Sequence, residues 1–144
     1  MKDEAMNEQL GRISEIRYVA LGAGKQCEVK VLVDDRDTNW LPYTSTISSA
    51  FKAHIPPREG DQVRVVNHEG KNEDGHVDNN IAYDGVPHHE LIDEDNIIFW
   101  AEDGTIYKHN LKEKTIEIET PCDVKITAPK IEFFGVVSVN GKVI

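Results

Sequence analysis

The residues best suited to catalysis lie together in one polar stretch, at His68, Asp74, His76 and Asp78. A histidine beside a carboxylate can act as a general base and activate a nucleophile or a water molecule. A hydrolase also needs that nucleophile and a group of donors for the oxyanion, and the sequence signals neither nearby. We therefore expect a solvated hairpin here, and we assign no catalytic residue.

A second group with potential chemistry is the pair His88 and His89, with Glu90 and Asp93 close behind. These residue types are common metal ligands. Adjacent side chains on an extended segment point in opposite directions, however, so two neighbouring histidines rarely bind one ion. We expect exposed histidines in a linker, and we predict no metal site.

Cys27 and Cys122 have no CxxC companion and both fall within apolar strand patterns, so we predict buried, reduced thiols. The acidic stretch at residues 34–39 lacks the spacing and final glutamate of an EF-hand, which favours a hairpin tip. The glycine-rich residues 21–25 lack the GxxxxGK[ST] spacing and precede a strand, which favours a turn over a phosphate-binding loop. No cofactor is predicted.

The charge of the chain limits its partners. Its 144 residues contain 16 basic and 26 acidic residues, for a net charge of −10. Nucleic-acid binding is driven by lysine and arginine, so this balance argues against a nucleic-acid partner. No apolar run approaches the length of a membrane span, and the first residues lack the apolar core of a secretory signal. We expect synthesis, and any assembly, in the cytoplasm.

The first half of the chain reads as short strands separated by turns. After one or two marginal helical turns in residues 1–10, we predict five strands: residues 12–19, residues 26–33, a strand that begins at Trp40, residues 62–67 and residues 76–83. The inward side chains are expected to be Cys27, Val29, Val31, Val33, Val63 and Val65, together with Ile13 and Tyr18 if a kink lies between them, and Trp40 is expected to be a large anchor. Such a series suits a small closed barrel of the OB type.

The last third of the chain has a different pattern. Residues 97–100 and 105–109 are predicted strands, the first buried on both faces, with turns at residues 102–104 and 110–114. Over residues 115–128 the apolar side chains fall on one parity and the charged side chains on the other, which is typical of a strand with one dry face. The parity of the apolar residues switches after Pro129. The predicted dry face consists of Ile116, Ile118, Cys122, Val124, Ile126, Ile131, Phe133, Val137 and Val139.

This ribbon has no later element to cover it. It could fold back onto the first two thirds of the chain, stack on itself as a single-chain β-helix, or wrap with identical ribbons from other chains. A single-chain solenoid needs repeats of equal length, and too few are present. Wrapping between chains also removes the exposed strand edges, so we favour an intertwined oligomer.

The order of these parts resembles the phage baseplate assembly protein V family, the central spike of contractile-tailed phages, which is related to Mu-type spikes and VgrG proteins. In the first half the resemblance is carried by Gly11-Arg-Ile13, Val29-Lys-Val31, Trp40-Leu-Pro42, residues 57–63, Gly75-His-Val77 and Ile81-Ala-Tyr83. In the last third it is carried by residues 98–107, residues 111–116 and residues 139–143. It therefore spans about residues 11–144.

The resemblance implies an all-β homotrimer that pierces the host cell envelope as a needle beneath the tail tube. Its parts would be an N-terminal segment (1–10), an OB-fold domain (11–84), a linker (85–96) and a trimeric, triple-stranded β-helix (97–144), with the dry face as trimer core. Its implied partners are the baseplate hub and tail tube proteins and, transiently, the host outer membrane. The implied location is the virion, after assembly in the host cytoplasm.

The chain differs from the family at its end. Several members finish with a His-x-His tip that binds iron, and no such motif follows Lys142. We assign no metal there: either a separate PAAR-like tip protein caps the shaft, or the tip has been cut from the sequence, or the spike is blunt. The alternative is an OB-fold module that binds oligonucleotides or carbohydrates through Trp40, Tyr43 and Tyr83, which the acidic balance disfavours.

Overall fold

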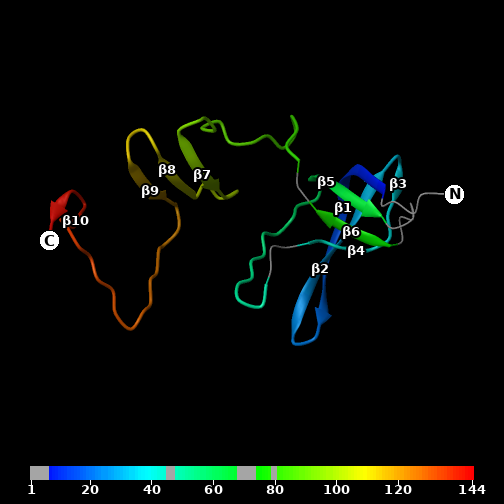
Figure 1. Ribbon diagram of the computed structural model, residues 1–144, viewed down its shortest axis with the longest axis horizontal. Helices are drawn as coiled ribbons and strands as arrows, with labels where there is room; N and C mark the ends of the chain where they lie inside the picture. The colour runs from blue at the N-terminus through cyan, green and yellow to red at the C-terminus, as the bar shows by residue number, and fades with distance from the viewer. Residues whose placement is uncertain (1–6, 45–47, 68–73, 79–80) are drawn as a thin grey trace. The chain divides into compact units, whose positions relative to one another are not determined.

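The computed structural model describes residues 7–44, 48–67, 74–78 and 81–144, and all regular elements of these residues are β-strands (Figure 1). The predicted all-β class is confirmed to this extent. The chain divides into two compact units, residues 1–88 and residues 89–144. Each unit is described by itself below.

The first unit contains six strands in one antiparallel sheet. They are β1 (Asn7–Leu21), β2 (Gly24–Val33), β3 (Arg36–Asp37), β4 (Leu41–Pro42), β5 (Gln62–Asn67) and β6 (Gly75–Asp78). The sheet order is β3-β2-β1-β5-β6, and β4 pairs with β2 beside this path. β4 also lies against β6, because Tyr43 forms a parallel bridge with Val77 and the Thr44 amide donates to the Val77 carbonyl at 3.0 Å.

Strand β1 is longer than the predicted strand. Its first part pairs with β5, where Gln9 lies opposite Val65, and its second part pairs with β2. The expected helical turn is therefore wrong for residues 7–10, because β5 supplies backbone partners that an isolated turn lacks; residues 1–6 lie outside the described part. The register shifts between Ile13 and Glu15, and such a bulge bends a strand. The bend lets the first part of β1 pair with β5 and the second part pair with β2.

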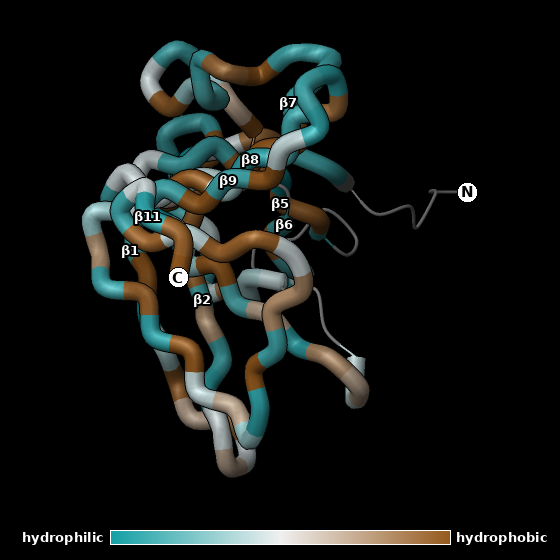
Figure 2. Tube along the Cα trace, turned by 90° about the vertical axis from the view of Figure 1, so that its left-hand side faces the viewer, coloured by the Kyte–Doolittle hydropathy of each residue, from teal (hydrophilic) through white to brown (hydrophobic). Residues whose placement is uncertain are grey.

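The core of the first unit follows the predicted alternation, which Figure 2 makes visible along β1 and β2. The buried cluster contains Ile13, Cys27, Val29, Val31, Val33, Leu41, Val63, Val65 and Val77. Tyr18 lies on the inward side as predicted, opposite Cys27, but is 47% exposed. The expected anchor Trp40 lies outside the core. Neighbouring residues of a strand face opposite sides, so Leu41 enters the core and Trp40 turns out, where Arg17 covers its ring at 4.3 Å.

A glycine stands where the loop before β6 ends. Gly75 opens β6 with φ of +127°, and a Cβ atom there would collide with the Val66 carbonyl. β6 is shorter than the strand predicted for residues 76–83. The predicted polar hairpin falls mainly on residues 68–73, which lie outside the described part of the chain.

The second unit consists of a three-stranded antiparallel sheet and a small hairpin. The sheet contains β7 (Asn96–Trp100), β8 (Ile106–Asn110) and β9 (Thr115–Glu119), and the hairpin contains β10 (Ser138–Val139) and β11 (Lys142–Val143). The predicted turns between β7, β8 and β9 are confirmed; the Gly104 amide donates to the Ala101 carbonyl at 3.1 Å.

The chain between β9 and β10 is not a strand of this sheet. The alternating pattern runs on past Glu119, but residues 120–137 have no β-ladder and form the long orange excursion in Figure 1. The prediction of one continuous strand over residues 115–128 is therefore wrong within a single chain. An alternating sequence shows that one side of a segment is suited to burial. A strand also needs a neighbouring segment to pair with its backbone N–H and C=O groups.

Candidate functional site

One side of the β7–β9 sheet is lined mainly by apolar side chains, and we call this side the apolar face. Its side chains form two rows across the three strands. The rows are Ile97, His109 and Ile116, and Phe99, Tyr107 and Ile118. A shallow hollow of about 270 Å³ lies over these residues. The predicted position of His109 opposite the alternating run is confirmed by its pairing with Ile116.

The apolar face is uncovered within the second unit. Phe99 is 68% exposed, Ile118 is 62% exposed and Ile116 is 77% exposed. Across residues 89–144, all of which are described, Thr105 is the single buried residue. The prediction that residues 97–100 are buried on both faces is therefore wrong for one chain. This unit has paired strands but no hydrophobic core of its own.

The opposite face of the sheet is polar where Asn96, Asn110 and Thr115 lie, and further along it carries Ile98, Trp100 and Ile106 beside polar residues. Lys108 lies 3.2 Å from Glu117, and the Asn110 side-chain amide donates to the Asn96 side-chain oxygen at 2.7 Å. These pairs are satisfied and suited to contact with water. The sheet thus has one face lined by apolar side chains and one mixed face, which we call the polar face, and the apolar face has no cover in the unit.

The predicted dry-face residues occupy three kinds of place. Ile116 and Ile118 lie on β9 within the apolar face, Val139 is exposed on β10, and Val137 is half-buried just before it. The remaining residues are exposed along the excursion: Cys122, Val124, Ile126, Ile131 and Phe133. Sequence reasoning missed that Phe99 and Tyr107 extend the same face. The signal was the spacing of two between Ile97 and Phe99, and between Tyr107 and His109.

The start of the excursion is tied to the β7–β8 turn by Asp103. This carboxylate accepts the Thr105 amide at 2.8 Å and the Cys122 thiol at 3.2 Å. These donors, the Thr105 amide foremost, lower the pKa of Asp103. Thr105 and Thr120 add a hydroxyl pair at 2.8 Å. Cys122 is exposed in one chain, contrary to the predicted buried thiol, whereas Cys27 is buried as predicted.

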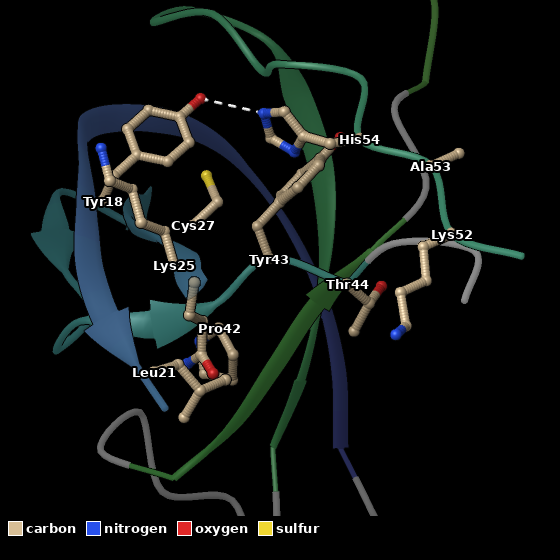
Figure 3. A pocket seen from close by; sticks show the side chains of 11 residues that line it. Tyr18, Leu21, Lys25, Cys27, Pro42, Tyr43, Thr44, Lys52, Ala53 and His54 are labelled. Atoms are coloured by element: carbon tan, nitrogen blue, oxygen red, sulfur yellow. Dashed lines mark hydrogen bonds between the residues drawn. The ribbon is translucent and has the colours of Figure 1, made fainter. Parts of the chain in front are cut away.

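A separate pocket of about 820 Å³ lies in the first unit, beside the β1–β2 hairpin (Figure 3). We call it the hairpin pocket. Tyr18 and Cys27 line it from the two strands, Tyr43 follows β4, and His54 comes from the loop after residue 50. The Tyr18 hydroxyl and His54 Nε2 are 3.2 Å apart, and the two rings meet edge to face. Sequence reasoning did not predict this pocket.

Tyr18 and Cys27 are held in their neutral forms in the hairpin pocket. Burial raises the pKa of the Cys27 thiol, and desolvation followed by the neighbouring Cys27 raises the pKa of Tyr18. A nucleophilic cysteine needs a lowered pKa, so Cys27 lacks the activation that covalent catalysis requires. The pocket is suited to binding.

Among the polar residues first considered for catalysis, Asp78 is paired with an arginine. Arg64 holds Asp78 with a two-pronged contact, from Nε at 2.9 Å and from a terminal nitrogen at 3.2 Å, while His76 Nε2 is 3.5 Å from Asp78. This carboxylate raises the pKa of Arg64. Asp74 is exposed, and His68 lies outside the described residues. The structure therefore assigns Asp78 an ion pair between β5 and β6.

The linker histidines do not converge. His88 is exposed, and the His89 ring lies 5.6 Å from the Trp100 ring. Among the residues that the structure describes, no three His, Cys, Asp or Glu side chains are grouped closely enough to hold a metal ion.

Comparisons with known proteins add no assignment: no family model matches the sequence, and no curated protein matches it. Within the described residues, no helix is long and apolar enough to span a membrane. The geometry of the two units therefore carries the functional argument.

Proposed function

We propose that this chain is the trimeric spike of a contractile phage tail or a related injection machine, a needle that helps to pierce the host envelope. The observation that carries the proposal is the second unit, which has ordered strands but a single buried residue, Thr105. A three-stranded sheet needs a covered apolar face for stability. The cover that the proposal supplies is two further copies of the same unit.

Identical copies suit this unit because its apolar residues continue beyond the sheet. Val124, Ile126 and Phe133 lie along the excursion, where residues 120–137 form no ladder within the chain. Three copies wrapped about one axis would pair these segments with one another and turn the same side chains inward. Every backbone group would then be satisfied and no strand edge left open. Such a shaft resists axial force, because local failure must break several ladders together.

The first unit is proposed to be the OB-type collar of this spike. Its pairings support a small barrel: β1 pairs with β2 and β5, β5 pairs with β6, and β4 contacts both β6 and β2. Among the described residues, the link between β4 and β6 is a single parallel bridge, between Tyr43 and Val77, and closure of the barrel there is part of the proposal. The core cluster draws its side chains from β1, β2, β4, β5 and β6, as a barrel interior would. A five-stranded Greek-key barrel is the OB arrangement.

The partners follow from the resemblance described above. The collar would bind the baseplate hub and tail tube proteins, the free end of the shaft would accept a PAAR-like tip protein, and the assembled spike would belong to the virion. The role is mechanical, so it requires no residue with the pKa of a catalyst. The strongest contacts would be those between the three chains.

Sedimentation equilibrium of the full chain tests the proposal. We expect a trimer at micromolar concentration that survives electrophoresis in SDS without heating. A stable monomer, with the apolar face covered by its own first unit, would refute the spike. A monomer that binds oligonucleotides or sugars would support the alternative of an OB-fold binding module.

A further inference from the structure

The charge around the hairpin pocket is opposite to that of the chain. The protein carries a net charge of −10, yet the described residues that line this pocket include Lys25, Lys52 and His54 and no carboxylate. Both lysines are exposed at the pocket rim. On an acidic protein, a cavity with a cationic rim attracts a negatively charged group and repels the protein's own surface.

The interior of the hairpin pocket is apolar and aromatic. Figure 3 shows the Cys27 sulfur between the side chains of Tyr18 and Tyr43, with Leu21 and Pro42 on the same side as Lys25. A volume of about 820 Å³ falls within the usual range of ligand pockets. It has room for more than one side chain. The site therefore combines an apolar interior with positive charge at its edge.

The loop beside the hairpin pocket extends the apolar surface. Phe51 is 77% exposed and Ile55 is 80% exposed, on either side of the pocket-lining residues 52–54. Phe51 is held in place by a turn, because the Ser48 amide donates to its carbonyl at 2.9 Å and its own amide donates to the Ser48 hydroxyl at 3.3 Å. Large apolar side chains presented in this way beside a pocket are typical of protein-binding surfaces.

We propose that the hairpin pocket docks a peptide segment of a partner protein, in which an apolar or aromatic anchor enters the pocket and flanking Asp or Glu residues meet Lys25 and Lys52. A peptide fits better than a nucleic acid, because strand binding needs a continuous basic track and this rim supplies two lysines. The proposal concerns the first unit alone, so it does not depend on how the second unit assembles.

Fluorescence polarisation of the full chain with pooled, labelled octapeptides tests this site. One pool has a central Phe, Leu or Trp flanked by random Asp and Glu, a second pool has the same anchors flanked by Lys and Arg, and a third probe is a labelled oligothymidylate. We expect saturable binding of the acidic pool, at least tenfold tighter than that of the basic pool.

Two variants and one control locate the binding. Reversing both lysines in Lys25→Glu/Lys52→Glu should weaken the acidic pool about tenfold, a factor of about three for each exposed ion pair. His54→Ala should weaken binding, because it removes the ring that lines the hairpin pocket beside Tyr18. The control Lys112→Glu/Lys142→Glu makes the same change in net charge on exposed residues of the second unit, and it should bind like the unmodified chain. Unchanged thermal unfolding shows that each variant is folded.

Protection of Cys27 supplies an independent readout. Peptide mapping after maleimide treatment should show slower labelling of Cys27 when the acidic pool is bound, because the thiol lies in the interior of the pocket. Absence of acidic-pool binding, equal binding by the pocket variants, or tighter binding of the oligothymidylate would each overturn the proposal. None of these results bears on the trimeric spike, whose test is the mass of the assembly.

Discussion

Replacing Ile118 by Asp places a carboxyl group in the middle of the apolar face. Ile118 lies on β9 opposite Tyr107 and is 62% exposed in one chain. In the proposed trimer this side chain is covered by the neighbouring copies. The substitution therefore removes apolar contact and buries an acid in its place, in all three chains at once.

The size of the effect follows from that exposure. Covering a whole isoleucine side chain is worth about 1.5–3 kcal/mol, so covering 62% of it is worth about 1–2 kcal/mol in each chain. Burial that raises the pKa of the new acid by about two units costs about 3 kcal/mol more. Three chains together lose about 12–15 kcal/mol, which lowers the trimer association constant by about nine to eleven powers of ten.

Sedimentation equilibrium measures this loss directly, and Thr115→Asp is the matched control. Thr115 lies on the same strand and pairs with Asn110 on the polar face, so the same charge there remains in water. We expect monomers for Ile118→Asp and trimers for the control. Trimers of normal stability from Ile118→Asp would refute the assignment of the apolar face to the trimer core. Loss of assembly in both variants would mean that the polar face is covered as well.

Three further outcomes follow from individual contacts. Cys122 is exposed in one chain but belongs to the predicted trimer core. Maleimide should therefore label it slowly in the native assembly and rapidly after dissociation. Rapid labelling in the intact trimer would place Cys122 outside the core. Leu41→Ala should destabilise the first unit by about 2–5 kcal/mol in thermal or urea unfolding, because Leu41 is 1% exposed in the core; a loss below about 1 kcal/mol would contradict its position. The pKa of Asp103 in the folded protein should lie below its ordinary value of 3.8. The ionised carboxylate therefore stabilises the turn fully above pH 3.8, and this stabilisation is lost as the pH falls through the lowered pKa. NMR titration of the Thr105 amide checks this, and an ordinary midpoint would show that the hydrogen bonds to Asp103 are absent.

Much of the local structure could be predicted from residue order. The alternation of Cys27, Val29, Val31 and Val33 identified the buried side of β2, because successive side chains of a strand face opposite ways. Glycine and polar residues likewise located the turns of both units. These features depend on neighbours in the sequence and on the conformations that each residue type allows.

The hairpin pocket could not be predicted in this way. Its walls come from segments distant in sequence: the β1–β2 hairpin, Tyr43, which the pairing of β4 with β2 brings close, and His54, whose ring meets Tyr18. None of these segments has a motif of its own. A cavity is the space that packing leaves between segments, and residue types alone do not define that space.

The sequence by itself determined which side of each strand is apolar, where the chain turns, and that its last third has more apolar surface than it can cover. Only the tertiary structure decided that β1 serves two neighbours, that Leu41 rather than Trp40 enters the core, and that β9 ends at Glu119. The physical reason is that sidedness is a local property of alternating residues. Strand length and burial depend instead on which distant segment supplies the hydrogen bonds and the opposing surface.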